Sequence, residues 1–317
     1  MRALPLLSLL LGGWIMVPAH ADEAKDWLDR LSQAEQHQSY QGTFVYERSG
    51  SFSTHRIWHR VDGQRVSERL LQLDGSAQEV VRVDGHTQCV SGKLASGVES
   101  GQGSNARILD AQKLEALYDI TVVGQSRVAD RPAVILSLNP RDQYRYGFEV
   151  HLDKETGLLL KSLLLNEKRQ LLERFQFTQL DTRDVPTDAQ LQPSGQCNAV
   201  AHQTVPDQPS TQTWRSEWLP PGFVLVSSTV HKDPESKATV TSLMYDDGLA
   251  RFSVFLEPLK ESAAADIRTQ LGPTVAVSRR LNTPEGEVIV TVVGEIPMGT
   301  AERIALSFRA NVTQAKQ

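Results

Sequence analysis

The sequence lacks an apolar run long enough to span a membrane as a helix. Its longest run, Leu4 to Val17, follows the basic Arg2 and falls short of the roughly 20 residues that a span requires. The run ends at Ala19-His20-Ala21, a small-x-small pattern that signal peptidase cuts. We therefore expect residues 1–21 to be a signal peptide, cleaved after Ala21, and the mature chain to be exported. An uncleaved anchor is disfavoured because the run is short.

A surplus of basic residues is also missing. Beyond residue 21 the chain has 32 lysines and arginines against 38 aspartates and glutamates. Proteins that bind nucleic acid carry a basic surplus, because they must neutralise phosphates. The composition therefore argues against nucleic acid as a partner. The 296 residues that follow the expected cleavage site are enough for two domains of ordinary size.

The sequence contains no recognisable catalytic or cofactor-binding motif. Gly101 to Asn105 lacks the third glycine of a dinucleotide fingerprint and the Lys-Ser/Thr of a phosphate loop, and no Gly-x-Ser-x-Gly elbow occurs. His55 and His59 share one face of a strand, but no acidic residue stands at ligand spacing beside them. We interpret them as ordinary strand histidines and expect no cofactor, no metal and no enzymatic activity. A hydrolase built around them is the least favoured alternative, because the motifs are missing. It stays open as an alternative, since catalytic groups can meet in space without being close in sequence.

Cysteine is scarce, with only Cys89 and Cys197 in the chain. An exported chain permits disulfides, and neither cysteine has the neighbours of a metal site. A bridge between them would close a loop of about a hundred residues, which stabilises by about 4–5 kcal/mol in the chain-entropy model. We favour the bridge over two separate thiols.

What the sequence does contain is a change of hydrophobic period. From Ala24 to His37 the apolar residues recur with the period of about 3.6 residues that is typical of a helix. After His37 they recur about every second residue, as in strands. Asp-Gly pairs at Asp62, Asp74 and Asp84 separate short alternating runs, which predicts successive hairpins. Gln112 to Ile120 predicts one brief helix. The first domain, residues 22–180, is thus expected to be an antiparallel meander covered by helices.

Five further strands are predicted at Ile120–Val123, Ala133–Leu138, Tyr144–Leu152, Leu158–Leu165 and Leu171–Thr178. In the third of these, alternation places Tyr144, Tyr146, Phe148, Val150 and Leu152 on one face and Arg145, Glu149 and His151 on a solvated face. About nine or ten such strands curl under their own twist. The concave apolar face must then be filled by helices, by a second layer or by a ligand.

Residues 181–213 contain four prolines, six glutamines and no Phe, Trp or Tyr, which is typical of a linker. A smaller α+β domain with an antiparallel sheet is predicted for residues 214–317. Its strands are expected at Phe223–Val230, Ala238–Met244, Arg251–Leu256, Val275–Arg279 and Val288–Val293. Helices are expected near Ala263–Leu271 and at Ala301–Asn311, the second with Thr300 as its N-cap.

Two tryptophans stand four positions apart where this domain begins. A tryptophan buries about 150–250 Å², so neither Trp214 nor Trp218 should be fully exposed. We assign Trp218 to the core of the second domain, with Leu219 and Phe223, and Trp214 to an interdomain seam or a partner groove. The alternative is that both belong to the core. The candidate partner-binding residues are Trp214, Arg215, Trp218, Leu219 and Phe223.

Four segments carry a resemblance: LYDITVVGQSRVADRPAVI (Leu117 to Ile135), TWRSEWLPPGF (Thr213 to Phe223), MYDDGLARFSVF (Met244 to Phe255) and TVVGEIPMGTAERIA (Thr291 to Ala305). They resemble signature segments of the RseB/MucB family of periplasmic regulators of the envelope-stress sigma factor. The resemblance implies a first domain shaped like lipoprotein carriers of the LolA type, an unclosed barrel with helices inside it. It also implies a periplasmic protein that binds the periplasmic part of a membrane-spanning anti-sigma factor of the RseA/MucA type and shields it from proteolysis.

The same resemblance implies release of that partner when lipid or lipopolysaccharide binds. Burying an acyl chain stabilises a complex by about 0.8 kcal/mol per methylene, enough to shift a two-state protein. The candidate lipid-binding residues are Phe44, Tyr46, Tyr146, Phe148, Phe175 and Phe177, and the alternative for each is ordinary core packing. A periplasmic lipid or lipoprotein carrier is the alternative function, and a homo-oligomer is possible.

Overall fold

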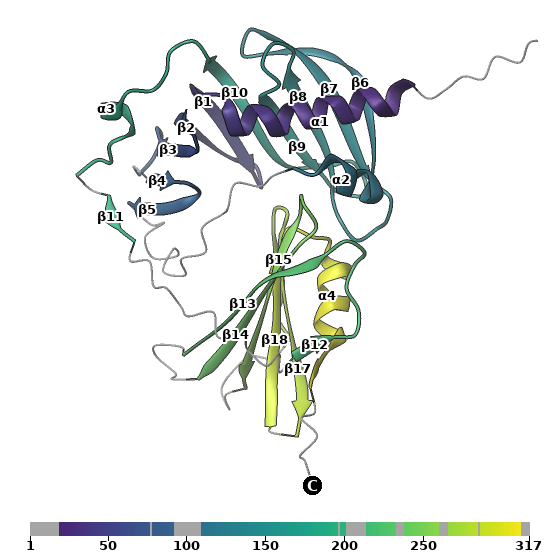
Figure 1. Cartoon of the computed structure of the whole chain (residues 1–317). Coiled ribbons are helices and arrows are strands. Elements are labelled where there is room, and N and C mark those ends of the chain that lie inside the picture. Colours follow the sequence, from purple (N-terminus) through teal and green to yellow (C-terminus); the bar gives the residue numbers. More distant parts are fainter. Residues whose placement is uncertain are drawn as a thin grey trace, which may run out of the picture.

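The structure is a computed structural model that describes residues 19–76, 78–91, 109–195, 197–200, 214–232, 238–259, 266–284 and 286–311. It contains a large and a smaller antiparallel sheet, one above the other in Figure 1. In the described part of the chain no helix combines the length and the apolar character that a membrane span needs. The expected signal peptide, except for its last residues, lies outside the described residues.

The first domain is one curved sheet of eleven strands whose two end strands do not pair with each other. The order is β11 (Asn198–Ala199), β5 (His86–Val90), β4 (Glu79–Val83), β3 (Arg65–Gln72), β2 (Ser51–Asp62), β1 (Tyr40–Arg48), β10 (Leu171–Asp181), β9 (Leu159–Leu165), β8 (Gly147–Asp153), β7 (Arg131–Pro140) and β6 (Tyr118–Val128). The predicted unclosed, mainly antiparallel architecture is therefore confirmed.

Helix α1 (Ala19–His37) crosses the first-domain sheet, and the short α2 (Ala111–Leu117) lies at the end that faces the second domain (Figure 1). Four residues of α1 at helical spacing are buried: Ala24, Leu28, Leu31 and Ala34. The predicted helix is thus confirmed, although it begins earlier than expected. The Asp84-Gly85 turn also forms as predicted, because both residues adopt the positive φ that a two-residue hairpin needs.

The start of the predicted linker differs from that prediction. Helix α3 (Asp188–Leu191) and strand β11 lie within it, and β11 pairs with β5. Cys89 and Cys197 are joined by a disulfide at the same edge of the sheet. The buried carboxylate of Glu79 accepts hydrogen bonds from Arg69 and from the backbone and side chain of Ser194. Polar contacts and a bridge hold this aromatic-free stretch against the sheet.

The second domain is a six-stranded sheet in the order β13 (Val224–Lys232), β14 (Thr239–Asp246), β15 (Arg251–Pro258), β18 (Gly286–Gly294), β17 (Thr274–Thr283) and β16 (Arg268–Leu271). Helix α4 (Met298–Ser307) covers it, and β12 (Trp214–Ser216) pairs with β19 (Phe308–Ala310). The five strands predicted for this domain all exist, while the short β12, β16 and β19 were not predicted.

Both helices predicted for the second domain need correction. Within the expected helix 263–271, residues 268–271 form strand β16, which turns into β17 at Gly272 with a φ of 59°; residues 263–265 lie outside the described part. Leu271 is 69% exposed, so its apolar character reflects no buried helix stripe. The last helix begins after Pro297 rather than after Thr300, and it ends at Ser307 because Phe308 continues as a strand against β12.

Candidate functional site

The candidate lipid-binding residues divide into three groups. Phe44, Tyr46, Phe175 and Phe177 lie together because β1 pairs with β10, which sets Phe44 opposite Phe177 and Tyr46 opposite Phe175. The ring centroids of Phe44 and Phe175 are 4.7 Å apart, and those of Phe175 and Phe177 are 5.1 Å apart. These four residues form the aromatic cluster of the first domain.

The other two candidates lie elsewhere. Phe148 packs against a second core cluster, which is built by α1, α2 and strands β6 to β8, with its ring edge toward Tyr118 at 6.5 Å. Tyr146 precedes β8 and is buried apart from both clusters. Burial, with Glu167 and Glu295 nearby, raises the pKa of Tyr146 to about 12. Four of the six candidate lipid-binding residues therefore lie together on β1 and β10, whereas Phe148 and Tyr146 lie apart from them.

A small cavity opens beside the aromatic cluster. Its volume is about 90 Å³, and its lining consists of Glu35, Tyr40, Leu158, Leu159, Phe175, Phe177 and Leu180. Pockets for small molecules usually measure roughly 300–1,000 Å³. The cavity as it stands is therefore too small for an acyl chain. Helix α1, whose Leu28 and Leu31 are buried in the neighbouring cluster, covers this part of the domain.

A wider groove of about 600 Å³ runs between α1 and β6, and sequence reasoning did not find it. It is lined by Glu23, Trp27, Arg30, Val122, Val123, Gly124, Gln125, Val134 and Lys154. The Arg30 guanidinium carbon lies 4.1 Å from the centre of the Trp27 ring. Trp27 and Arg30 stand three positions apart on the predicted helix, so the spacing in the sequence was the one available signal.

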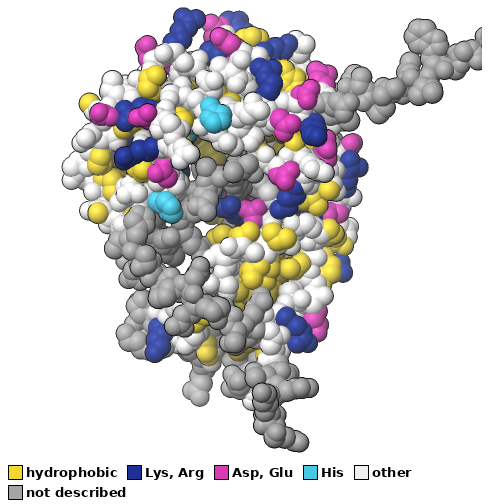
Figure 2. Space-filling view, in the orientation of Figure 1, with side chains coloured by type: hydrophobic (Ala, Val, Ile, Leu, Met, Phe, Trp, Pro, Cys, Tyr) yellow, Lys and Arg dark blue, Asp and Glu magenta, His cyan; other side chains and the backbone are white. Residues whose placement is uncertain are grey.

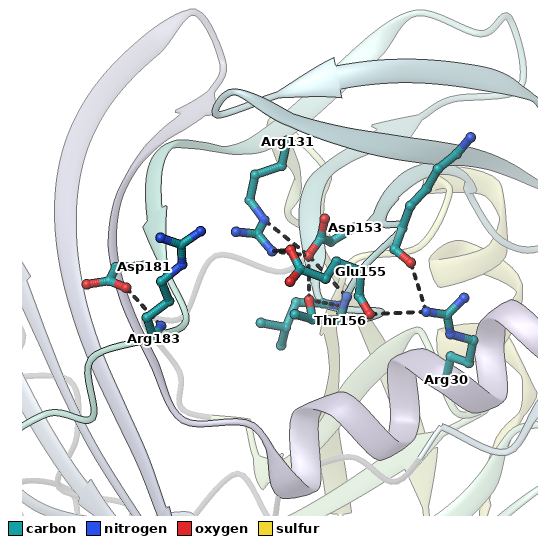
Figure 3. Close-up of polar contacts among 9 residues, drawn as sticks. Arg30, Arg131, Asp153, Glu155, Thr156, Asp181 and Arg183 are labelled. Atoms are coloured by element: carbon teal, nitrogen blue, oxygen red, sulfur yellow. Dashed lines mark hydrogen bonds and ion pairs between the residues drawn. The ribbon is translucent and has the colours of Figure 1, made fainter.

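Polar contacts fix α1 to the turn between β8 and β9 (Figure 3). Arg30 of α1 donates to the carbonyl oxygens of Lys154 at 2.9 Å and Glu155 at 3.4 Å. The turn itself is held by Asp153, which accepts from Arg131 at 2.7 Å and from the Thr156 hydroxyl at 2.6 Å. Burial alone would raise the pKa of Asp153, but these hydrogen bonds hold it below its usual value. The cover of the first domain is thus anchored by an ionised carboxylate.

His55 and His59, the two histidines of β2, stack on aromatic rings. His55 lies 5.1 Å from the Phe44 ring, and His59 lies 4.8 Å from the Tyr40 ring. Among the residues that the structure describes, no three His, Cys, Asp or Glu side chains gather as metal ligands.

At the seam between the domains, the tryptophan assignments change. Trp214 and Trp218 are half-buried, and both pack against the core of the second domain with Leu219, around the buried Phe223. Trp218 also contacts the first domain, because its ring centroid lies 5.1 Å from that of Tyr144. Within the second domain, the Arg303 guanidinium carbon lies 3.8 Å from the centre of the Trp218 ring. The packing of both tryptophans agrees with the alternative that both belong to the core, and the observed contact across the seam is made by Trp218 and not by Trp214. Arg215 is exposed on β12.

The prediction that Arg145 faces solvent is wrong. β8 begins only at Gly147, so the alternation expected from Tyr144 onward does not apply, and the Arg145 side chain is completely buried between the domains. It forms an ion pair with Asp247, which stands 102 positions later in the sequence. No local periodicity could have predicted this contact.

An exposed apolar strand lies at the edge of the second-domain sheet. Val224 and Val226 of β13 are 52% and 51% exposed, and Leu225 and Val230 are also exposed. Hydrophobic side chains gather over this part of the second domain in Figure 2. Exposed apolar surface of this kind often marks a site for another protein.

Comparison with known proteins shows which family has this two-domain architecture. Residues 23–195 match the model of the MucB/RseB N-terminal domain, and residues 208–309 match that of the MucB/RseB C-terminal domain. The chain belongs to the MucB/RseB family. It is 58% identical to the sigma factor AlgU regulatory protein MucB of Pseudomonas aeruginosa, over 100% of both chains. It is 30% identical to the sigma-E factor regulatory protein RseB of Salmonella typhimurium, over 93% of this chain and 94% of that one.

Solved structures from this MucB/RseB family show the same fold. A structure of the P. aeruginosa MucA/MucB complex matches with a TM-score of 0.83 at 57% identity, over 92% of this chain and 100% of that chain. A crystal structure of MucB matches with a TM-score of 0.70 at 57% identity, over 92% of this chain and 98% of that chain. The family resemblance that the four sequence segments carried is therefore confirmed.

Proposed function

We propose that this protein regulates an envelope-stress sigma factor by binding the periplasmic part of a membrane-spanning anti-sigma factor and shielding it from proteolysis. The observation that supports this most is the full-length identity of 58% to MucB, together with the match to the MucA/MucB complex. The exposed strand β13 and the half-buried Trp214 and Trp218 offer apolar surface for such a partner. In this proposal the protein acts by binding and has no catalytic role.

The test is titration calorimetry of the mature chain with the periplasmic domain of P. aeruginosa MucA. We expect saturable binding, and we expect the bound MucA domain to resist digestion by an added protease for longer than the free domain. Absence of binding, or equal digestion of free and bound MucA, would contradict the proposal. Trp214→Ala tests the predicted partner residue, because it removes an aromatic anchor; an unchanged Kd would remove Trp214 from the site.

Export to the periplasm is part of the proposal. Its support is the small-x-small pattern at Ala19-His20-Ala21 after the apolar run. N-terminal sequencing of the protein from a periplasmic fraction should give Asp22 as the first residue.

Release of the partner by lipid is the second part. The aromatic cluster with its cavity of about 90 Å³ supports it, because this is where an acyl chain would find apolar partners once α1 moved. Each buried methylene would stabilise the lipid-bound form by about 0.8 kcal/mol. We expect lauric acid to weaken MucA binding in a dose-dependent way. Unchanged MucA affinity at saturating lauric acid would contradict release by lipid and would leave the proposed binding of the anti-sigma factor intact.

A further inference from the structure

Arg145 joins the two domains through a fully buried guanidinium. Its Nη1 donates to Asp247 Oδ2 at 2.5 Å and its Nη2 to the Pro221 carbonyl at 2.6 Å, both in the second domain. On its own side, Nε and Nη2 donate to the two carboxylate oxygens of Asp142 at 3.1 and 2.9 Å. The side chains of Arg145 and Asp247 are both 0% exposed. Each domain therefore supplies part of the shell around one buried charge.

The geometry on the second-domain side is equally constrained. The other oxygen of Asp247 accepts the backbone N–H groups of Leu249 at 2.9 Å and Ala250 at 2.7 Å, which fixes the turn after β14. Hydrogen bonds between charged groups are directional, and a buried ion pair is costly to break. A rotation of one domain against the other would therefore break several of these bonds together, so the contact specifies one domain angle.

The turns of the second domain at Gly222 and Gly248 pack closely against helix α2. Gly222 has a φ of 85°, and a Cβ there would lie 2.6 Å from Leu117 Cδ2. A Cβ on Gly248 would lie 3.5 Å from Leu114 Cδ2, and Leu249 packs against the first-domain core cluster that contains both leucines. Helix α2 thus forms the first-domain wall of the seam next to Arg145.

Helix α2 also belongs to the interior of the first domain. Its three buried residues, Ala111, Leu114 and Leu117, share one cluster with Ala24, Leu28 and Leu31 of α1. The segment that carries Arg145 follows β7 and is hydrogen-bonded to the end of α2: the Arg141 backbone N–H donates to the Leu117 carbonyl at 2.9 Å. A displacement of α1 would therefore disturb α2, and a displacement of α2 would disturb the seam.

We infer that Arg145 is a positioning residue that fixes the domain angle required for partner binding, and that α2 couples this angle to the packing of α1. The inference rests on the proposed regulatory function and specifies how it is controlled. Two structures of MucA/MucB complexes match this chain with TM-scores of 0.83 and 0.80, whereas a MucB structure of the same 57% identity and 92% coverage gives 0.70. The overall structure of this chain is thus more similar to those of the complexes than to the MucB crystal structure.

The test uses the mature chain with spin labels on cysteines introduced at the exposed positions Asp62 and Leu306, one in each domain. The two native cysteines are bonded to each other, so the added thiols react alone. Three quantities are measured for wild type and Arg145→Met: the interdomain distance distribution, the Kd for the P. aeruginosa MucA periplasmic domain, and amide exchange in α2. We expect the variant to broaden the distances, weaken binding by about tenfold and speed exchange in α2.

Arg69→Met is the matched control. Arg69 is 15% exposed and pairs with the buried Glu79 at 2.6 Å within the first domain, so its loss also breaks a buried ion pair, but away from the seam. We expect it to lower stability and leave all three quantities unchanged. The inference is overturned if Arg145→Met keeps the narrow distances, the wild-type Kd or the wild-type exchange, or if Arg69→Met has the same effects.

Two further outcomes are informative. If Arg145→Met does not fold, Gly222→Ala takes its place, because it keeps every partner of Arg145 and pushes on Leu117 instead. The same three changes are then expected, and their absence overturns the inference. If the wild-type chain does not bind MucA, the proposed function fails, while the distances and the exchange in α2 still decide whether Arg145 and α2 are coupled.

Discussion

The interior of the first domain and the seam between the domains are stabilised in opposite ways. In the interior, Phe44, Phe175 and Phe177 make apolar ring contacts and leave a cavity of about 90 Å³. At the seam, the fully buried Arg145 and Asp247 add directional hydrogen bonds to apolar contacts such as that between Trp218 and Tyr144. Apolar contacts depend on area and tolerate rearrangement, whereas a buried ion pair loses most of its stabilisation when its geometry changes.

This difference suits the two regions to different roles. An interior of flexible apolar contacts can adapt to a guest, because rings and aliphatic chains can repack around it. A seam that contains directional hydrogen bonds has few alternative arrangements. A displacement of the neighbouring helices would therefore break these bonds and release the fixed angle between the domains. Helix α2 contacts the second core cluster of the first domain through Leu114 and Leu117, which also lie beside the glycines of the seam. Helix α1 connects this cluster with the aromatic cluster, because it contributes buried residues to both.

Asp247→Asn should show the largest effect, because it leaves the Arg145 charge buried with one carboxylate fewer. We expect the free energy of unfolding, measured by urea denaturation, to fall by about 3–5 kcal/mol. The control is Asp188→Asn: Asp188 is 83% exposed in its pair with Arg60, and such pairs contribute at most about 1 kcal/mol. A loss of less than about 1 kcal/mol for Asp247→Asn would show that the ion pair does not stabilise the seam.

Most of the fold could be predicted from local pattern. Helix α1 keeps an apolar stripe through Leu28 and Leu31, and the Asp84-Gly85 pair supplies the positive φ of a hairpin. The predictions failed where tertiary contacts decide. Phe308 is apolar enough to extend the last helix, but its strand pairs with β12, ninety-odd positions earlier. The same applies to Leu271, which stands in a hairpin and not in the expected helix.

The candidate site was predicted only in part, for the same reason. Alternation placed Phe175 and Phe177 on one face of a strand, and the pairing of β1 with β10 brings Phe44 beside them. It misplaced Arg145, because a charged residue flanked by tyrosines is typical of a solvated strand, and its partner Asp247 belongs to another domain. The composition of residues 181–213 similarly gave no sign of the contacts between Ser194 and Glu79.

Phe175→Ala should give an intermediate effect and sharpen the description of the interior. Removing a half-buried ring next to the cavity is expected to lower the free energy of unfolding by about 2–3 kcal/mol. It should also enlarge the cavity, so lauric acid should raise the Tm of the variant more than that of wild type. Phe52→Ala is the control, because Phe52 is 63% exposed and its loss should change stability by less than about 0.5 kcal/mol. Equal Tm shifts in Phe175→Ala and wild type would show that the cavity is not a lipid site.

Acid should have the smallest effect and should separate the two regions by pH. His55 stacks on Phe44, and burial lowers its pKa despite the opposing charge of Asp74. The unfolded chain therefore binds the proton first, so this contribution to stability is complete above the unfolded value of about 6.5 and is lost as the pH falls through the lower folded value. Burial alone would lower the pKa of Arg145, but Asp142 and Asp247 hold it above its usual value, so the seam keeps its cation throughout.

We therefore expect the free energy of unfolding to fall as the pH drops from about 6.5 to about 5, within the range in which histidine titrates. The label distances across the seam should stay constant in the same range. His55→Gln should reduce the pH dependence in part, because His151, whose pKa burial also lowers, still titrates in the same direction. If acid instead broadened the interdomain distances before it lowered stability, the seam would be the pH-sensitive region, and the division between an adaptable interior and a fixed seam would be wrong.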